Sequence, residues 1–485
     1  MSVLTQAHAT ARRVPRVRPR FRKTELGLLA VVSTALVVGG ASLGATERWL
    51  KAQAAGEKLT SFGFAPPDPR GLGVYLVALL LVHALFVLAG RRTDQILLPA
   101  VGMLGGIGLL LMQRLPQDLV TQSLGPMDLK LGQLQLLWLL ISLGVITAFA
   151  LLVRSDRWLR AYKYTWAAIG IALLALTFVF GSDVNGARLT LSIGPVSGQP
   201  SELLKVILVV FLAAYLSENR SLLAVESTRI GPLRLPPIPY LAPMVAMWAI
   251  ALGIVVVQRD LGAALLFFAV FLALLYVATG RASYVIGGVV LFLAGSFVLY
   301  HLFAHVQVRV DNWLDPFRDP LNQGFQTVQA LYAFARGGLL GVGLGAGLPT
   351  IAGHLPVPAV HTDYPLAALG EELGLMGLLA IFGLYLVIVE RGLRIAAAAH
   401  DEFRALLAAG LSLVIGIQAF IIAAGNLKLI PLTGITLPFI SYGGSSLLAN
   451  AIAVGLLLAL SDRGAVPPPP PRSRRWRRLR PRRAQ

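Results

Sequence analysis

Long apolar runs separated by short polar gaps follow one another along the whole chain, and this pattern predicts helices that cross a bilayer. A transmembrane helix needs about 20 consecutive, predominantly apolar residues. The gaps between the runs contain Gly, Pro and Arg, which end helices and mark connecting segments. The twelve predicted spans are 26–46, 71–90, 96–112, 133–153, 164–181, 202–217, 238–257, 261–279, 283–304, 366–389, 404–424 and 443–461.

Composition supports a membrane protein. Of the 485 residues, 56% are hydrophobic and 13% are charged, whereas a soluble domain carries about 25% charged residues. The net charge of +19 would suggest nucleic acid binding in a soluble protein. Here we attribute it to the positive charge of cytoplasmic loops, and we expect no nucleic acid partner. The absence of cysteine excludes disulfides, thiolate metal sites and cysteine nucleophiles.

Basic residues predict the orientation. Lys and Arg concentrate in cytoplasmic segments, and seven of them lie among the first 25 residues, with a further arginine run in the last fourteen. With twelve spans, both termini are therefore expected in the cytoplasm. No small-residue cleavage site follows the first span, so we expect it to be retained rather than removed as a signal peptide.

The expected organisation is an all-α, polytopic membrane protein in four parts. Residues 1–25 form a basic cytoplasmic arm, and residues 26–92 form two N-terminal transmembrane helices. Residues 93–462 form a ten-helix core that includes a long extracytoplasmic loop, 305–365. Residues 463–485, rich in Pro and Arg, cannot bury apolar surface and are expected to be a disordered cytoplasmic tail.

Polar residues next to the spans are candidates for function, because an ionisable group near hydrocarbon is costly unless it is paired or used. The first cluster follows the fifth span, and its Gly and Pro residues predict a tight, re-entrant type of loop. Pro200 and Ser201 are typical of a helix start. Glu202 and Lys205, three residues apart on that helix, share a face and can pair. A purely structural ion pair is the alternative for these two residues.

Two further clusters interrupt the apolar pattern on the same predicted outer side. Gln258–Gly262 separates two apolar runs, and its Arg259 and Asp260 predict a tight turn. Pro431–Ser446 breaks the chain with prolines and glycines at membrane depth. Irregular backbone at that depth must be buried in protein or line a cavity. Its serines are candidate donors to phosphate, and a purely structural break is the alternative.

The last cluster closes the long outer loop. Asp363 lies beside His361 and Thr362 in a predicted loop, where its structural alternative is a helix cap or an Asx-turn. Glu371 and Glu372 lie in the first turns of the next helix, where the helix dipole favours anions, so at least one of them has a structural explanation. Asp363 is therefore the strongest candidate for a catalytic carboxylate.

These motifs resemble the SEDS (shape, elongation, division and sporulation) family, the group of RodA and FtsW. The resemblance covers about residues 95 to 462 in the family's order, with two additional helices before it. Three positions depart from the family's usual pattern: Thr190, Arg259 and Val342. The elements that carry the resemblance are Asn185–Arg188, Gln199–Lys205, Gln258–Gly262, Gly337–Gly347, His361–Tyr364, Gly370–Gly374 and Pro431–Ser446.

The resemblance implies a peptidoglycan glycosyltransferase in the bacterial cytoplasmic membrane, acting in cell shape, elongation or division. Such a protein polymerises lipid II on the extracytoplasmic face, in contact with membrane lipid, and works with a class B penicillin-binding protein. The family's essential loop aspartate falls on Asp363, our candidate general base. No cofactor is required, and a divalent cation is compatible with the chemistry. The expected substrate-binding residues are Arg188, Gln199, Ser201, Glu202, Lys205, Arg259, Asp260, His361, Thr362, Glu371, Glu372, Ser441, Tyr442, Ser445 and Ser446.

Two other classes of function compete with the polymerase. A flippase for the lipid-linked precursor would also use broken helices and intramembrane charges. However, transporter sites lie near the bilayer midplane, whereas these polar clusters gather on one side. A non-catalytic scaffold of the cell-wall synthesis complex would need no acidic loop residue, so Asp363 distinguishes it from an enzyme.

Overall fold

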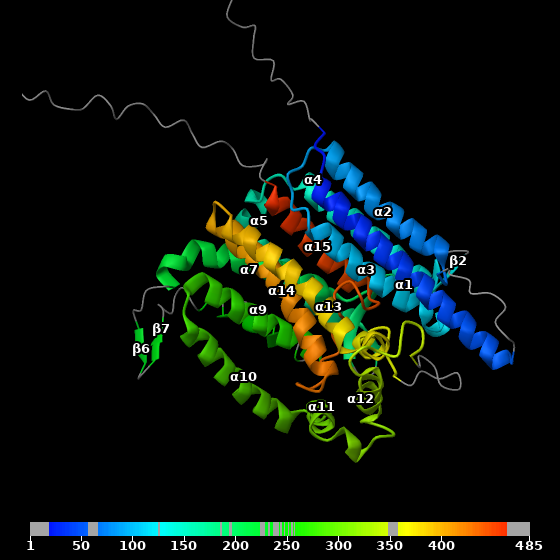
Figure 1. Ribbon diagram of the computed structural model, residues 1–485. Helices are drawn as coiled ribbons and strands as arrows, with labels where there is room; N and C mark the ends of the chain where they lie inside the picture. Colours follow the sequence, from blue (N-terminus) through cyan, green and yellow to red (C-terminus); the bar gives the residue numbers. More distant parts are fainter. Residues whose placement is uncertain are drawn as a thin grey trace, which may run out of the picture.

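The computed structural model describes most of the chain as a helical bundle (Figure 1). The predicted tail 463–485, most of the arm 1–25 and most of the predicted span 238–257 lie outside the described residues. The described residues are 19–56, 66–124, 127–184, 187–193, 196–223, 228–230, 233–235, 258–347 and 357–462, together with separate positions between 242 and 256.

Helices dominate the element order, and short strands occur only in the connections. The helices are α1 (Lys23–Ala55), α2 (Pro69–Leu88), α3 (Leu97–Arg114), α4 (Leu131–Leu152), α5 (Arg157–Ala161), α6 (Lys163–Phe180), α7 (Pro200–Leu223), α9 (Leu261–Thr279), α10 (Ala282–Leu302), α11 (Ala304–Leu314), α12 (Phe325–Gly337), α13 (Pro365–Ala397), α14 (Glu402–Asn426) and α15 (Gly444–Ser461), with 3-10 turns η1 (Gln117–Leu119) and η2 (Pro316–Arg318). The strands are β1 (Thr121–Leu124), β2 (Met127–Lys130), β3 (Ser182–Val184), β4 (Ala187–Ile193), β5 (Val196–Gly198), β6 (Thr228–Ile230) and β7 (Leu233–Leu235).

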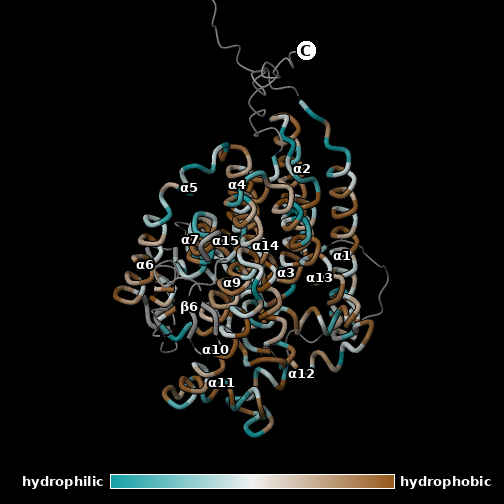
Figure 2. The backbone as a smooth tube through the Cα atoms, turned by 90° about the vertical axis from the view of Figure 1, so that its left-hand side faces the viewer, coloured by the Kyte–Doolittle hydropathy of each residue, from teal (hydrophilic) through white to brown (hydrophobic). Residues whose placement is uncertain are grey.

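Eleven of the described helices are long and apolar enough to cross a membrane. They correspond to eleven of the twelve predicted spans, and the all-α polytopic prediction is confirmed. Figure 2 shows hydrophobic colouring along the helices and more hydrophilic colouring on the segments that join them. This distribution is expected when lipid contacts the sides of the bundle and water contacts its ends.

The predicted structure of one connection is wrong. The segment before α7 was expected to be a re-entrant type of loop, but it forms antiparallel strands: β4 pairs with β3 on one side and β5 on the other. The reason lies in residues 187–193, where apolar and polar side chains alternate with the two-residue period of a strand.

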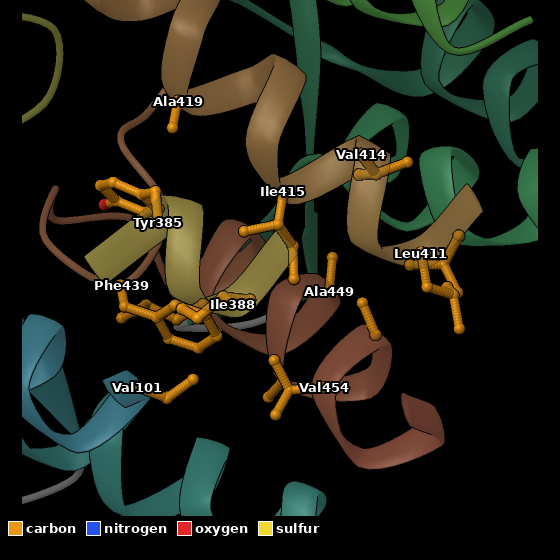
Figure 3. Packing of buried hydrophobic residues seen from close by; sticks show 14 of the residues in the cluster. Val101, Tyr385, Ile388, Leu411, Val414, Ile415, Ala419, Phe439, Ala449 and Val454 are labelled. Carbon is orange, nitrogen blue, oxygen red and sulfur yellow. The ribbon is translucent and has the colours of Figure 1, made fainter. Parts of the chain in front are cut away.

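The central helices pack through small and aliphatic side chains. α15 packs along α4, α13 packs along α14, and α7 packs against α14, α6 and α9. Figure 3 shows Val414 and Ile415 of α14 among Ile388 of α13 and Ala449 of α15. Close approach of helices through small residues is a general device of membrane bundles, because lipid offers no hydrophobic driving force between helices.

The two N-terminal helices lie at the edge of the bundle, where α1 packs on α3 and α2 packs on α4 (Figure 1). A buried polar network joins them near the start of α1. Glu25 Oε2 lies 2.5 Å from Arg22 Nη2, and Glu25 Oε1 lies 2.6 Å from His83 Nδ1 on α2. Arg22 also donates to Thr93 Oγ1 at 2.9 Å, in the connection that leads to α3. Each buried charge therefore has a partner, as charges in a nonpolar environment require.

Candidate active site

The irregular segment between α14 and α15 runs through the interior of the bundle, as predicted for Pro431–Ser446. Phe439 is buried with a φ of 65°, and the hydroxyl of Tyr385 on α13 donates to Pro438 O at 2.6 Å. Figure 3 shows Phe439 beside Ile388 and Val101. Gly108 of α3 allows this approach, since a Cβ there would lie 2.6 Å from Ile440 O. The non-helical backbone is thus held by protein contacts at membrane depth.

The turn that carries Asp363 is held by two hydrogen bonds from this segment and by one from the end of α14. Tyr442 N donates to His361 O at 2.8 Å, and Ser441 Oγ donates to Thr362 O at 2.6 Å. Asn426 Nδ2, at the end of α14, donates to Asp363 O at 2.8 Å. The structure therefore brings together the predicted residues His361, Thr362, Asp363, Ser441 and Tyr442, although 78 or more positions separate the two groups in the sequence.

The carboxylate of Asp363 does not cap the helix that follows it. The N-cap of α13 is Tyr364, and no side chain caps that helix. Burial raises the pKa of Asp363 to about 6, while the Thr362 side chain and the positive charge of Arg309 oppose the rise. A carboxyl group with a pKa near neutrality is better matched to proton transfer than one with an ordinary pKa. Of the two structural alternatives for Asp363, the helix cap is therefore wrong, and the Asx-turn stays an alternative.

Arg309 on α11 is a charged neighbour that sequence reasoning missed. Its Nη1 donates to Leu432 O and Thr433 O, both at 3.3 Å. The same region contains buried polar atoms that have no hydrogen-bond partner among the described residues: His361 Nδ1, Asn426 Oδ1 and Thr433 Oγ1. Burial also lowers the pKa of His361, which favours its neutral form. Buried polar atoms without a partner are uncommon in proteins, and a bound ligand or water is one explanation for them.

A second group of predicted residues lies on α7. Lys205 is buried and its Nζ lies 2.6 Å from Glu202 Oε2, which confirms the predicted pair. The same Nζ lies 2.7 Å from Gln418 Oε1 on α14. Gln418 Nε2 in turn donates to Thr436 O at 2.8 Å. Gln418 had no sequence signal, because a single glutamine inside an apolar helix is not distinctive.

Ser445 and Ser446, at the start of α15, make hydrogen bonds that connect the start of α7 with the irregular segment. Thr436 Oγ1 lies 2.5 Å from Ser446 Oγ and 3.4 Å from Glu202 Oε1. Ser445 Oγ accepts from Gln199 N at 2.9 Å. Both predicted serines therefore bond to other parts of the protein in this structure.

The third group surrounds Asp260, which forms the predicted tight turn. Arg259 has a φ of 66°, and Asp260 caps α9 by accepting from Ala263 N at 3.0 Å. Its other oxygen accepts from Gln199 Nε2 at 3.0 Å and from Ser201 Oγ at 3.1 Å. The predicted residues Gln199, Ser201 and Asp260 thus form one buried network.

Glu371 and Glu372 belong to a different group, formed with the glycine-rich segment. Glu372 makes an ion pair with Arg114 of α3 and accepts from Gly345 N at 3.1 Å. Glu371 Oε1 lies 3.2 Å from Arg336 Nη2 of α12. Both carboxylates are buried and paired, so their geometry supports a structural role in fixing the glycine-rich segment against α13.

Gly341 in this segment offers a test of that packing. Its φ is +81°, and an added Cβ would lie 2.1 Å from Glu372 O, whereas Gly338 has a φ of +52° and open space around it. Gly338 combines this φ with a ψ of −137°, a backbone conformation that side chains rarely adopt, so we expect Gly338→Ala to cost about 1–3 kcal/mol from the backbone alone. Gly341→Ala should lower the melting temperature substantially further. Equal losses from the two variants would contradict the close packing of the segment on α13.

The structure says less about two of the predicted substrate-binding residues, Arg188 and Arg259. The backbone of Arg188 lies in β4 opposite Asp183, and its side chain lies outside the described residues. Arg259 is exposed. Burial lowers the pKa of His305 on α11, and the positive charges of Arg259 and Arg309 lower it further. Within the described chain, no group of three or more His, Asp or Glu side chains is arranged to hold a metal ion.

Comparison with known proteins identifies the family. The FtsW/RodA/SpoVE model, described as a cell cycle protein, matches residues 95–464. The chain belongs to this family. With eleven candidate spans, this member is a multi-pass membrane protein. Helices α1 and α2 precede the matched region.

Curated relatives within the family cover most of the chain. Peptidoglycan glycosyltransferase RodA of Mycobacterium tuberculosis is 42% identical over 400 residues, which cover 81% of this chain and 84% of the relative. A probable peptidoglycan glycosyltransferase FtsW of Geobacter metallireducens is 38% identical over 295 residues, which cover 60% of this chain and 75% of the relative.

Solved structures share the fold. A chain of a peptidoglycan synthase complex that coordinates polymerization and crosslinking matches with a TM-score of 0.59 and 28% identity, over 76% of this chain and 98% of that chain. The rod shape determining protein RodA of Thermus thermophilus matches with a TM-score of 0.51 and 24% identity, over 76% of this chain and 97% of the other.

Proposed function

We propose that this protein is a peptidoglycan glycosyltransferase that polymerises lipid II on the extracytoplasmic face of the bacterial cytoplasmic membrane. The names of its curated relatives support the activity. The observation that carries the proposal is the environment of Asp363, a carboxylate whose pKa is raised to about 6, on a turn that hydrogen bonds from Ser441, Tyr442 and Asn426 hold in place.

The described ends of the chain support the proposed orientation. Arg22 bonds to Arg91 O, and Arg91 Nη1 lies 2.7 Å from Asp462 Oδ2, so both ends meet at one end of the bundle. Asp363 and this meeting point lie at opposite ends of α13, which is 33 residues long. If the basic termini are cytoplasmic, Asp363 faces outward. The arm 1–25, the helices within 26–92, the core 93–462 and the tail 463–485 remain our proposed division.

The reaction would join two lipid-linked saccharides. A sugar hydroxyl oxygen attacks the anomeric carbon of a second sugar, whose bond to the pyrophosphate oxygen breaks with its electron pair. Asp363 accepts the hydroxyl proton as the new C–O bond forms. Such a base typically accelerates a reaction about 10²–10⁴-fold. The lipid chains of both substrates would remain in the bilayer, which explains why the catalyst is embedded in it.

The departing pyrophosphate needs positive charge or hydrogen-bond donors. Arg309, whose charge acts on Asp363, is one candidate, and Arg259, which acts together with Arg309 on the pKa of His305, is another. Lys205 already interacts with Glu202 and Gln418, so it would contact a substrate only while keeping or exchanging those bonds. A divalent cation remains compatible with this step.

A class B penicillin-binding protein is the proposed partner. The support is the similarity to a chain from a complex in which polymerization and crosslinking are coordinated. The proposed pairing places glycan synthesis and crosslinking in one assembly.

Reconstitution with purified lipid II tests the function. We expect glycan chains on a gel from the full-length protein in liposomes with its penicillin-binding partner. No polymer from the intact complex, while a known polymerase works in the same liposomes, would reject the polymerase. If that inactive preparation moves lipid II across the bilayer, the protein is a flippase. If it does not, the remaining alternative is a non-catalytic scaffold.

The pH dependence of polymerisation should report the ionisation of Asp363. A general base must be deprotonated, and the pKa of Asp363 is raised to about 6. We therefore expect the rate to be constant at higher pH and to fall as the pH decreases through about 6. Initial rates measured between pH 5 and 8 by the gel assay would give the midpoint.

Arg309 provides the control for this pH profile, because its positive charge lowers the pKa of Asp363. Arg309→Gln should move the midpoint to higher pH, whereas Arg309→Lys keeps the charge and should move it less. An unchanged midpoint in Arg309→Gln would show that the profile reports a different group.

A further inference from the structure

A cavity of about 1040 Å³ opens at the end of the bundle opposite Asp363. Its walls come from the start of α1, the connection between α2 and α3, and the ends of α13 and α15. The first residue of α13 that lines it, Arg391, comes 28 positions after Asp363 in the sequence and lies toward the other end of that kinked helix. The cavity is therefore distinct from the candidate active site.

The lining carries seven arginines but only two aspartates. Both aspartates are already paired. Asp94 Oδ2 accepts from Arg391 Nε at 2.9 Å and from Arg391 Nη2 at 2.5 Å, and Asp462 Oδ2 lies 2.7 Å from Arg91 Nη1. The acidic residues of the lining therefore cannot neutralise the remaining arginines.

Arg20 and Arg92 are the lining arginines left with unused charge. Their side chains are exposed and make no ion pair or hydrogen bond within the part of the chain that the structure describes. The other lining arginines each have a carboxylate partner: Arg22 with Glu25, Arg394 with Glu390 and Arg404 with Asp156. Two arginines of the same polar cavity thus lack a carboxylate partner within the described residues.

The two terminal segments contain no acidic side chain that could supply this counter-charge. Residues 1–18 precede Arg20 in the sequence, and residues 463–485 follow Asp462. Neither segment contains Asp or Glu, and both are rich in arginine.

Apolar surface lies beside the unused arginines. Phe21 and Leu88 are 62% and 61% exposed, and Arg20 N bonds to Val87 O at 3.0 Å, which places these residues next to one another. A ligand that combines a phosphate group with hydrocarbon would satisfy both features. Arginine suits phosphate because its planar fork donates two parallel hydrogen bonds.

We infer that this cavity binds the phosphate headgroup of an anionic phospholipid of the inner leaflet, with Arg20 and Arg92 as its main contacts. Basic pockets on the cytoplasmic side of membrane proteins bind such headgroups because the inner leaflet is negatively charged. The inference rests on the proposed orientation, in which this end faces the cytoplasm. It assigns a lipid-binding role to the junction between the N-terminal helices and the core.

Binding of short-chain lipids to the full-length protein in detergent tests the inference. Dioctanoyl phosphatidylglycerol should raise the melting temperature and be retained in native mass spectrometry, and dioctanoyl phosphatidylcholine should do neither. In the double variant Arg20→Gln, Arg92→Gln we expect affinity for phosphatidylglycerol to fall on the order of tenfold or more.

The matched control removes two charges from the same end of the bundle. Arg154 and Arg157 are exposed, lie outside the cavity and make no side-chain ion pair within the described residues. Arg154→Gln, Arg157→Gln should keep wild-type affinity. An equal loss in this control would show attraction by general positive charge and would overturn the site.

Binding of two other anions tests whether the cavity prefers a lipid headgroup to a free phosphate or an acidic peptide. Free pyrophosphate or a polyglutamate peptide that binds as tightly as the lipid, with the same dependence on Arg20 and Arg92, would overturn the lipid assignment. Weak binding of both would support it. Because the readout is binding in detergent, it does not depend on polymerisation, so failure here is separate from failure of the proposed enzymatic function.

Discussion

Asp363→Asn should abolish polymer formation while leaving the protein folded. The amide keeps the shape of the carboxylate but cannot accept the hydroxyl proton, so a loss of at least about 100-fold is expected. Burial raises the pKa of Asp363, which means that the ionised form is held at a cost in the folded protein. The variant should therefore melt at the same temperature as the wild type or higher. Gel analysis of glycan chains and thermal unfolding would measure both effects.

Asp118→Asn is a suitable control for this experiment. Asp118 precedes β1, near the same end of α3 that carries Arg114, and its side chain is 83% exposed. This variant should polymerise as the wild type does. Wild-type activity in Asp363→Asn would show that Asp363 is not the general base. Asp260, Glu371 and Glu372 would then be the next carboxylates to test.

Lys205→Met should destabilise the protein by about 3 kcal/mol, because removing one partner of a buried ion pair leaves the other charge uncompensated. Lys205 is 1% exposed and Glu202 is 12% exposed, so neither is well hydrated. Gln418 would lose the same partner. Thermal or chemical unfolding in detergent would measure the loss.

The double variant Glu202→Gln, Lys205→Met separates the structural role of this pair from a role in substrate binding. Removing both charges should recover much of the lost stability, since no unpaired carboxylate remains. Recovered stability together with lost polymerisation would place the pair in the substrate site, as predicted from the sequence. A single variant that melts like the wild type would show that the pair does not hold α7 and α14 together.

Local rules predicted the features that depend on neighbouring residues. The start of α7 at Pro200, the Glu202–Lys205 pair and the turn at Arg259 all appear as expected, because each is determined within a few positions of the chain. The alternating apolar and polar residues of β4 are an equally local signal, and they indicate a strand even though Gly and Pro flank them.

The sequence by itself determined the class of protein, eleven of the spans and the motif set, because the requirement for apolar length and the cost of charge in lipid act on each segment separately. Only the tertiary structure showed that Arg309 and Asn426 surround the Asp363 turn, that Gln418 joins the Lys205 pair, and that Glu372 serves the glycine-rich segment. These contacts join residues far apart in the chain, and helix packing decides which of them meet.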